Sequence, residues 1–223
     1  MQKKKLQNTG GHVNRVGKIK EFIMLNEATA TGKIIKELEY SHKVYNEKFY
    51  KTEIKVFRLS KNFDIIPVVI SERAIDTAKS YIGKSITVKG QYRSYNQRQG
   101  EKAKLILLLF ADSIEILKGS ENGQNNIKLR GSICREPFYR ITFDGKEIAD
   151  YMLAVNRAHG ATDYIPCISW GSGARTVSKL SISSVLEVEG RIQCRKYIKK
   201  HKDGTIEEGE AYEVSCSKII RKE

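Results

Sequence analysis

The sequence lacks the residue patterns that mark membrane proteins, secreted proteins and disulfide scaffolds. No stretch approaches the roughly 18 consecutive apolar residues that a membrane-spanning helix needs. The start, MQKKKLQNTGG, is basic but has no apolar segment behind it, so we do not expect a secretory signal. The four cysteines (Cys134, Cys167, Cys194 and Cys216) include no Cys-x-x-Cys pair, and Cys167 and Cys194 lie in apolar strand patterns that predict small buried residues. These absences favour a cytoplasmic protein with reduced cysteines and no membrane partner.

Patterns typical of catalysis, metal binding and phosphate loops are also missing. The histidines lie in loop-like segments without metal-ligand spacing. The segment GSGART at 171–176 is glycine-rich but lacks the Gly-x-x-x-x-Gly-Lys-Ser/Thr spacing that cradles phosphates. Glu187 and Glu189 resemble paired carboxylates, but no nucleophile and base stand near them. The sequence therefore predicts a protein that is not an enzyme and needs no metal or cofactor.

Positive charge is abundant and unevenly distributed. The formal net charge is +14 at pH 7. Residues 1–120 hold 23 Lys and Arg against 12 Asp and Glu, whereas residues 121–223 hold 17 against 14. Such an excess favours a polyanionic partner, either nucleic acid or an anionic membrane, although a basic surface can also serve solubility alone.

The chain contains an internal repeat with a period near 100 residues. With a shift of 99 residues, Asp64–Pro67 (DIIP) falls on Asp163–Pro166 (DYIP). One inserted residue later, Val88–Tyr92 (VKGQY) meets Val188–Ile192 (VEGRI). Solenoid repeats are far shorter, so this period indicates two copies of a whole domain. The copies have diverged unequally.

Alternating apolar patterns predict the same order of strands in both copies. The expected strands of the first copy are 29–38, 50–59, 64–70, 84–95 and 102–116, and those of the second are 127–134, 147–157, 163–170, 184–197 and 210–220. Helical spacing of apolar residues predicts a short helix over 71–82 and another over 172–180. This order predicts an all-β fold of two tandem OB-fold Greek-key barrels, each with a short helix between strands 3 and 4.

Composition predicts the boundaries between these domains. We expect a basic N-terminal arm over 1–27, a degenerate OB fold over 28–118 and a second OB fold over 127–223. The polar segment 119–126 (GSENGQNN) is typical of a linker between them.

Strand parity places several aromatic and basic residues of the second copy on one face. In the third strand, Tyr164 and Trp170 share a face, and in the fourth strand the row that holds Arg191 and Arg195 ends at Tyr197. Bases can stack on such rings while guanidinium groups follow the phosphates, and every base offers a π-face. The alternative is that Tyr164 and Trp170 are ordinary core aromatics.

The second copy resembles the bacterial single-stranded DNA-binding protein (SSB) family over nearly its whole length. The matching stretches are Arg135–Pro137, Leu153–Arg157, Asp163–Gly171, Val188–Tyr197 and Ala211–Ile219. The resemblance implies that Tyr164, Trp170 and Tyr197 stack on bases, and that His159 occupies the place of a further family aromatic. The implied nucleic-acid site also includes the basic residues Arg157, Arg191, Arg195 and Lys196.

The first copy carries the family pattern only weakly. Ile65, Ser71 and about Gln97 stand where the second copy has its stacking aromatics. We therefore expect the first barrel to have a lost or rebuilt stacking face, with Tyr92 and Tyr95 as the residues from which a new one could be built.

The resemblance implies a protein that binds and coats single-stranded DNA with low sequence preference in replication, recombination or repair. It also implies a homodimer with four OB folds, located in the cytoplasm with the nucleoid. Many family members end in an acidic tail that recruits replication and repair proteins, and the ending SKIIRKE implies that this tail is missing here. The open alternatives are a primosome-type or mobile-element accessory protein, in which one OB fold mainly serves protein assembly, and the nucleic-acid-binding part of an enzyme.

Overall fold

The computed structural model describes residues 24–100, 102–119, 123–200 and 204–222, and these are mostly β-strand. The strands of the N-terminal half (24–119) are β1 (Asn26–Ile34), β2 (Glu39–Val44), β3 (Glu47–Phe57), β4 (Phe63–Ser71), β5 (Ser85–Gln99) and β6 (Lys102–Ile116). Those of the C-terminal half (123–222) are β7 (Gln124–Ile141), β8 (Glu147–Asn156), β9 (Thr162–Trp170), β10 (Val185–Lys200) and β11 (Ile206–Lys222). The 3-10 turn η1 (Ala158–Gly160) and the helix α1 (Ser172–Val177) complete the C-terminal half. The prediction of an all-β chain is confirmed.

Each half closes five of its strands into a ring of hydrogen-bonded neighbours. In the N-terminal half the order is β1-β5-β6-β4-β3, and β3 returns to β1 through the pair Lys33 and Lys55. In the C-terminal half the order is β7-β10-β11-β9-β8, and β8 returns to β7. Within each ring, the last strand of the chain runs parallel to the third, β6 to β4 and β11 to β9. Both rings have the strand order expected of an OB fold.

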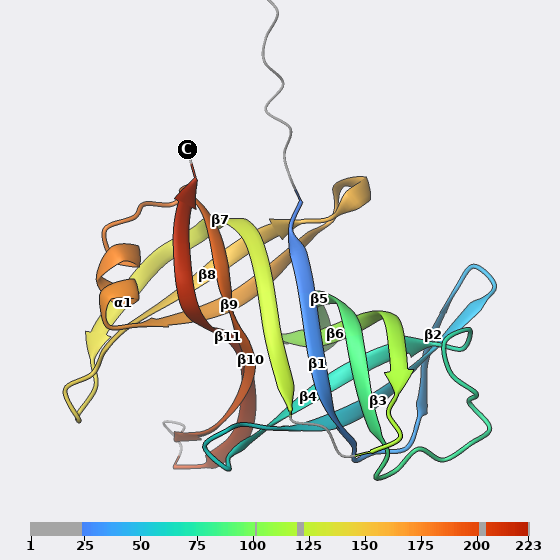
Figure 1. Cartoon of the computed structure of the whole chain (residues 1–223). Coiled ribbons are helices and arrows are strands. Elements are labelled where there is room, and N and C mark those ends of the chain that lie inside the picture. The colour runs from blue at the N-terminus through green and yellow to red at the C-terminus, as the bar shows by residue number, and fades with distance from the viewer. Residues whose placement is uncertain (1–23, 101, 120–122, 201–203, 223) are drawn as a thin grey trace, which may run out of the picture.

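The two halves are joined by the pairing of β1 with β7. β1 and β7 lie antiparallel and side by side at the centre of the molecule (Figure 1), with Ala28 opposite Ile127. Ile127 is also the residue that the 99-residue shift assigns to Ala28. The strand pair therefore lies on an approximate twofold axis that relates one half to the other.

The repeated glycines have a structural reason in both halves. A Cβ atom at Gly90 would collide with the carbonyl oxygen of Phe110, and one at Gly190 would collide with that of Ser215. Both glycines lie at a bulge, where the register of β5 on β6 and of β10 on β11 shifts. The bulge lets each strand bend around its barrel, so glycine is required at the same place in each copy.

The helix predicted over 71–82 is wrong, because residues 72–84 form turns. The side chain of Asp76 accepts the backbone N–H of Ala78, and a local bond of this kind competes with helix formation. Ile75 is nevertheless buried in the barrel core. In the C-terminal half the predicted helix is present but short, at Ser172–Val177.

The N-terminal half also contains a strand that the pattern did not predict. β2 forms a hairpin with β3, and its side chains are mostly exposed and polar, so the strand shows no alternation in the sequence. The predicted linker overlaps β7, which begins at Gln124. Most of the predicted N-terminal arm lies outside the described residues. None of the helices within the described ranges is long and apolar enough to cross a membrane.

Candidate nucleic-acid interface

The outer face of β9 presents two exposed aromatic side chains. Strand alternation turns Asp163, Ile165 and Cys167 into the protein, and it turns Tyr164 and Trp170 outward. Tyr164 is 45% exposed and Trp170 is 43% exposed. Six residues of extended chain separate the rings by about 20 Å along the strand. Neither ring is a core aromatic, so both are available to a ligand.

The row of β10 that holds Arg191, Arg195 and Tyr197 lies on the same face of the sheet. Strand pairing connects the two rows through β11: Arg191 stands opposite Ser215, and Ser215 stands beside Ile168 of β9. Residues that stand opposite each other in a sheet point to the same side. We call this outer face of β8–β11, with Tyr164, Trp170 and Tyr197, the C-terminal platform.

Tyr197 owes its position to a glycine on the neighbouring strand. Gly209 is its partner in the β10–β11 pairing, and a Cβ atom at Gly209 would lie 2.5 Å from Cζ of Tyr197. The tyrosine ring therefore covers Gly209 and lies close to the sheet. Together with Pro166, Tyr197 also lines a hollow of about 350 Å³ next to the N-terminal half.

Polar side chains connect the arginines of this face. Arg191 donates to Oε1 of Gln193 at 2.9 Å, and Nε2 of Gln193 donates to Glu213 at 2.7 Å. Arg195 lies 3.5 Å from the same glutamate and is half exposed. Partial burial and the nearby Arg58 lower the pKa of Arg191. The network holds both guanidinium groups in place along the platform.

The other predicted basic residues are placed differently. Arg157 lies 3.1 Å from the buried carboxylate of Asp163, on the side that faces the N-terminal half. Lys196 is exposed but lies on the opposite face of β10 from Tyr197. His159 belongs to η1, and its side chain lies outside the described residues. The structure therefore brings Tyr164, Trp170, Tyr197, Arg191 and Arg195 onto one face, but not Lys196.

Two buried aspartates that the sequence analysis did not assign connect the halves. Oδ1 of Asp163 accepts the backbone N–H of Ser94 at 2.7 Å, and Oδ1 of Asp64 accepts the backbone N–H of Cys194 at 3.4 Å. Each aspartate also pairs with an arginine of its own half, Arg157 or Arg58. The signal was present in the repeat, where an aspartate begins both DIIP and DYIP.

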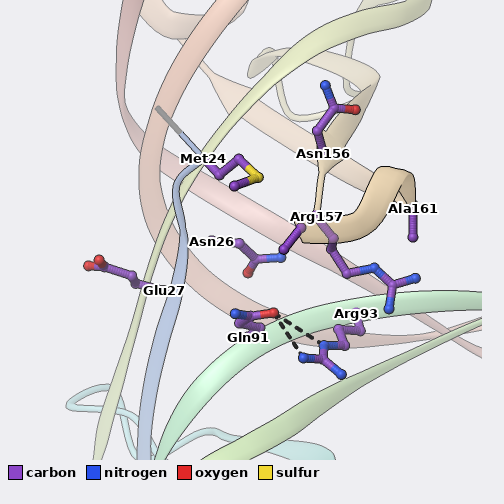
Figure 2. Close-up of a pocket in the computed structure, with 9 residues that line it drawn as sticks. Met24, Asn26, Glu27, Gln91, Arg93, Asn156, Arg157 and Ala161 are labelled. Carbon is purple, nitrogen blue, oxygen red and sulfur yellow. Dashed lines mark hydrogen bonds between the residues drawn. The ribbon is translucent and has the colours of Figure 1, made fainter. Parts of the chain in front are cut away.

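A pocket of about 630 Å³ lies between the halves and contains two arginines (Figure 2). Arg93 reaches into it from β5 and donates to Oε1 of Gln91 at 3.0 Å, while Arg157 reaches in from the C-terminal half. Burial lowers the pKa of Arg93, and the nearby Arg157 lowers it further. The pocket thus presents two guanidinium groups, of which Arg157 is paired with Asp163, and the carboxylate of Glu27 also belongs to its lining.

Two other kinds of candidate group are metal ligands and cysteines. Within residues 24–100, 102–119, 123–200 and 204–222, no cluster of three or more His, Cys, Asp and Glu is suited to a metal ion. All four cysteines are free; Cys167 and Cys216 are buried, whereas Cys194, which was expected to be buried, is partly exposed.

The closed strand rings and the exposed aromatic face define a protein of the OB-fold class. Over 90% of its length, the chain has the fold of the wild-type single-stranded DNA binding protein from Thermus aquaticus, with a TM-score of 0.69, 20% identity and 94% of that chain covered. Residues 124–220 match the family described as "Single-strand binding protein family". The C-terminal half is therefore similar to the SSB family over nearly its whole length.

Curated relatives match the same part of the chain. A single-stranded DNA-binding protein of Halalkalibacterium halodurans is 36% identical over 80 residues, which are 33% of this chain and 48% of the relative. Single-stranded DNA-binding protein A of Bacillus subtilis is 34% identical over 80 residues, again 33% of this chain and 46% of the relative. The chain thus spans about half the length of the curated relatives that it matches.

Proposed function

We propose that this protein binds single-stranded DNA with low sequence preference and coats it, using the C-terminal platform. The observation that carries this proposal is that Tyr164 and Trp170 are exposed on the same face as the ordered arginines of β10. Rings of this kind stack on any base, and the arginines neutralise phosphates without reading the sequence. The names of the relatives support the same ligand.

The shape of the platform fits an extended strand better than a single nucleotide. Tyr164 and Trp170 lie about 20 Å apart along β9, and Tyr197 lies beyond them on the β10–β11 hairpin. A ligand that touches all three rings must follow the sheet over several nucleotides. OB folds occupy roughly 4–16 nucleotides of single strand.

We further propose a non-enzymatic role in replication, recombination or repair, in the cytoplasm with the nucleoid. The proposed assembly is a homodimer with four OB folds, in which the units are 28–118 and 127–223. The match of residues 124–220 to the SSB family supports these statements, since SSB-family proteins are non-enzymatic DNA-binding proteins.

Quenching of Trp170 fluorescence tests the proposed ligand directly. Trp170 is the only tryptophan, so its emission reports one place on the platform. Titration with a short oligothymidylate is expected to quench it, and Trp170→Ala is expected to weaken binding by about tenfold or more, the value of one base stack. Tyr139→Ala is a matched control, because Tyr139 is a partly exposed aromatic of the same half that stands opposite Ala149, away from the platform. Absence of quenching, or equal losses in both variants, would contradict the proposal.

A further inference from the structure

The N-terminal half has a cluster of apolar side chains outside its barrel core. Phe49 of β3, Val69 of β4 and Leu108 of β6 form a small buried group, and Phe110 packs against it. The strand pairing places these residues on the outer side of the sheet, so their side chains point away from the barrel interior. The outer face of this half therefore has an apolar floor where a solvated sheet would carry polar side chains.

Aromatic side chains stand at the edge of this floor. Tyr95 of β5 is 40% exposed, and Nζ of Lys51 donates to its hydroxyl at 3.1 Å. His42 of β2 is exposed and stacks on Phe49, with ring centroids 5.0 Å apart and an interplanar angle of 11°. A cavity of about 650 Å³ lies between these residues. One ring face of His42 is covered by Phe49, and the side chain as a whole is exposed.

Arginines form the remaining side of the cavity. The guanidinium of Arg93 lies 3.9 Å from the centroid of Phe110, and Arg157 of the C-terminal half lines the same cavity. Both arginines also line the pocket between the halves. None of the described residues that line the 650 Å³ cavity is an Asp or a Glu. The apolar floor is thus bordered by cations that continue into the interface between the halves.

These residues do not occupy the positions of the C-terminal stacking aromatics. Ile65 and Ser71 stand where the C-terminal half has Tyr164 and Trp170. Tyr92 is fully buried and contributes nothing to the surface. The aromatic face comes instead from four strands, with His42 on β2, Phe49 on β3, Tyr95 on β5 and Phe110 on β6.

We propose that the outer face of β2–β6, with His42, Tyr95, Lys51 and Arg93 around the Phe49–Phe110 floor, is a second binding surface for single-stranded nucleic acid. A base lies flat against Tyr95 and the apolar floor, and the adjoining phosphates contact Lys51, Arg93 and Arg157. The strand then continues past Arg157 toward Tyr164, whose backbone N–H donates to Ser94 at 2.8 Å. This inference rests on the proposed function, because it extends the same ligand from the C-terminal platform to the N-terminal half.

The chemistry of the cavity favours this occupant over a purely apolar partner. A flat aromatic group attached to an anion matches both the apolar floor and the cationic border, and nucleotides have this combination at every residue of the strand. The excess of positive charge in residues 1–120 acts in the same direction.

The experiment separates the two faces by oligonucleotide length. Anisotropy is measured with fluorescein-labelled oligothymidylates of about 8 and about 35 nucleotides, chosen around the site size of one and of two OB folds. Tyr95→Ala is expected to weaken binding of the long strand by about five- to a hundredfold and to leave Trp170 quenching by the short strand unchanged. Tyr40→Ala is the control, because Tyr40 is exposed on the same half but pairs with Tyr50 on the other face of the β2–β3 hairpin.

A crosslink gives an independent measurement. A long strand containing 5-iododeoxyuridine is irradiated on the full chain, and the crosslinked peptides are identified by mass spectrometry. Crosslinks at Tyr95, Phe110 or His42 are expected. If the short strand quenches Trp170 while Tyr95→Ala binds the long strand like the wild type and no crosslink falls within residues 40–110, the second surface is refuted and the C-terminal platform stands. If neither strand quenches Trp170, the proposed function itself fails.

Discussion

Oδ1 of Asp163 in the C-terminal half accepts the backbone N–H of Ser94 in the N-terminal half at 2.7 Å. Both partners are buried. Asp64 makes the corresponding bond to the backbone N–H of Cys194, so the two halves exchange the same contact. Each of the long strands β5 and β10 is thus held by an aspartate of the opposite half, and these two contacts connect the halves.

Removing this carboxylate is expected to loosen the joint between the halves. Asp163→Ala leaves the buried N–H of Ser94 without an acceptor and Arg157 without its partner, which costs about 1–3 kcal/mol of unfolding free energy. Asp163→Asn keeps an acceptor oxygen and is expected to cost less. Urea unfolding measures both, with Asp144→Ala as the control in an exposed turn. Equal stability of Asp163→Ala and wild type would show that the bond does not contribute.

Asparagine variants of Asp163 and Asp144 are expected to show that the two aspartates change the stability in opposite directions as the pH falls. Burial raises the pKa of Asp163 above its ordinary value of 3.8, although the Ser94 N–H and Arg157 act against this. The folded state therefore binds this proton more readily than the unfolded state, and wild type gains stability relative to Asp163→Asn as the pH falls through the raised pKa toward 3.8. The pKa of Asp144 is lowered to about 2 by Lys146 and Thr142, so relative to Asp144→Asn the wild type loses stability as the pH falls from 3.8 to 2. Urea unfolding across this pH range checks both signs.

Separating the halves is expected to create a new self-association surface. In the full chain, residues Gln124–Leu129 of β7 pair with β1, and a fragment of residues 123–223 leaves their outer edge free. A free edge pairs readily with another strand. Because the β1–β7 pair is symmetric about Ala28 and Ile127, the fragment is expected to dimerise through two copies of β7 centred on Ile127. Sedimentation of the fragment and of an Ile127→Pro variant measures this, since proline removes an N–H from the edge. A monomeric wild-type fragment would contradict it.

The sequence was sufficient to place Tyr164 and Trp170 on the C-terminal platform, but it wrongly added Lys196 and was insufficient for the N-terminal face. Tyr164 and Trp170 alternate with buried residues on one strand, so strand parity alone places them outside. The N-terminal aromatic face combines four strands, and one of them, β2, has no alternating pattern. The repeat places Ile65 and Ser71 where the C-terminal half has stacking rings, so it shows that these rings are missing. It does not show which distant residues meet on the surface. That information depends on the register of β2 on β3 and of β5 on β6.

The hydrogen-bond partners between the two halves could not be predicted from the sequence for a related reason. Asp64 and Asp163 are visible in the repeat, but the carboxylate of each meets an N–H that is 130 or 69 residues away in the other half. The Arg191–Gln193 pair has a counterpart in Gln91–Arg93 with the two residue types exchanged, which a position-by-position comparison reads as divergence. The geometry is preserved although the order is reversed.

The position of the Tyr197 ring is expected to depend on Gly209. In Gly209→Ala the new methyl group would meet the end of the tyrosine ring, which must move away from the sheet. The fold is expected to remain, because a side-chain tip can shift, while affinity for single-stranded DNA falls by part of the value of one stack, about 1 kcal/mol or somewhat more. Gly119→Ala is the control, since nothing lies within 4 Å of a Cβ atom there. Anisotropy with a labelled oligonucleotide measures both, and an unchanged affinity in Gly209→Ala would exclude Tyr197 from the contact.

Salt dependence is expected to identify the arginine that contacts phosphate on the C-terminal platform. Arg195 is half exposed and is only loosely paired with Glu213, so it is available to a phosphate. On single strands each neutralised phosphate contributes a slope of about −0.7 to the plot of log affinity against log salt concentration. Arg195→Gln is expected to make the slope less steep by about that amount and to weaken binding to all sequences alike. Arg175→Gln, which removes an exposed arginine of α1 that pairs with Glu147, is expected to leave the slope unchanged. Titrations of both variants at several salt concentrations check this. An unchanged slope in Arg195→Gln would contradict a contact between Arg195 and a phosphate.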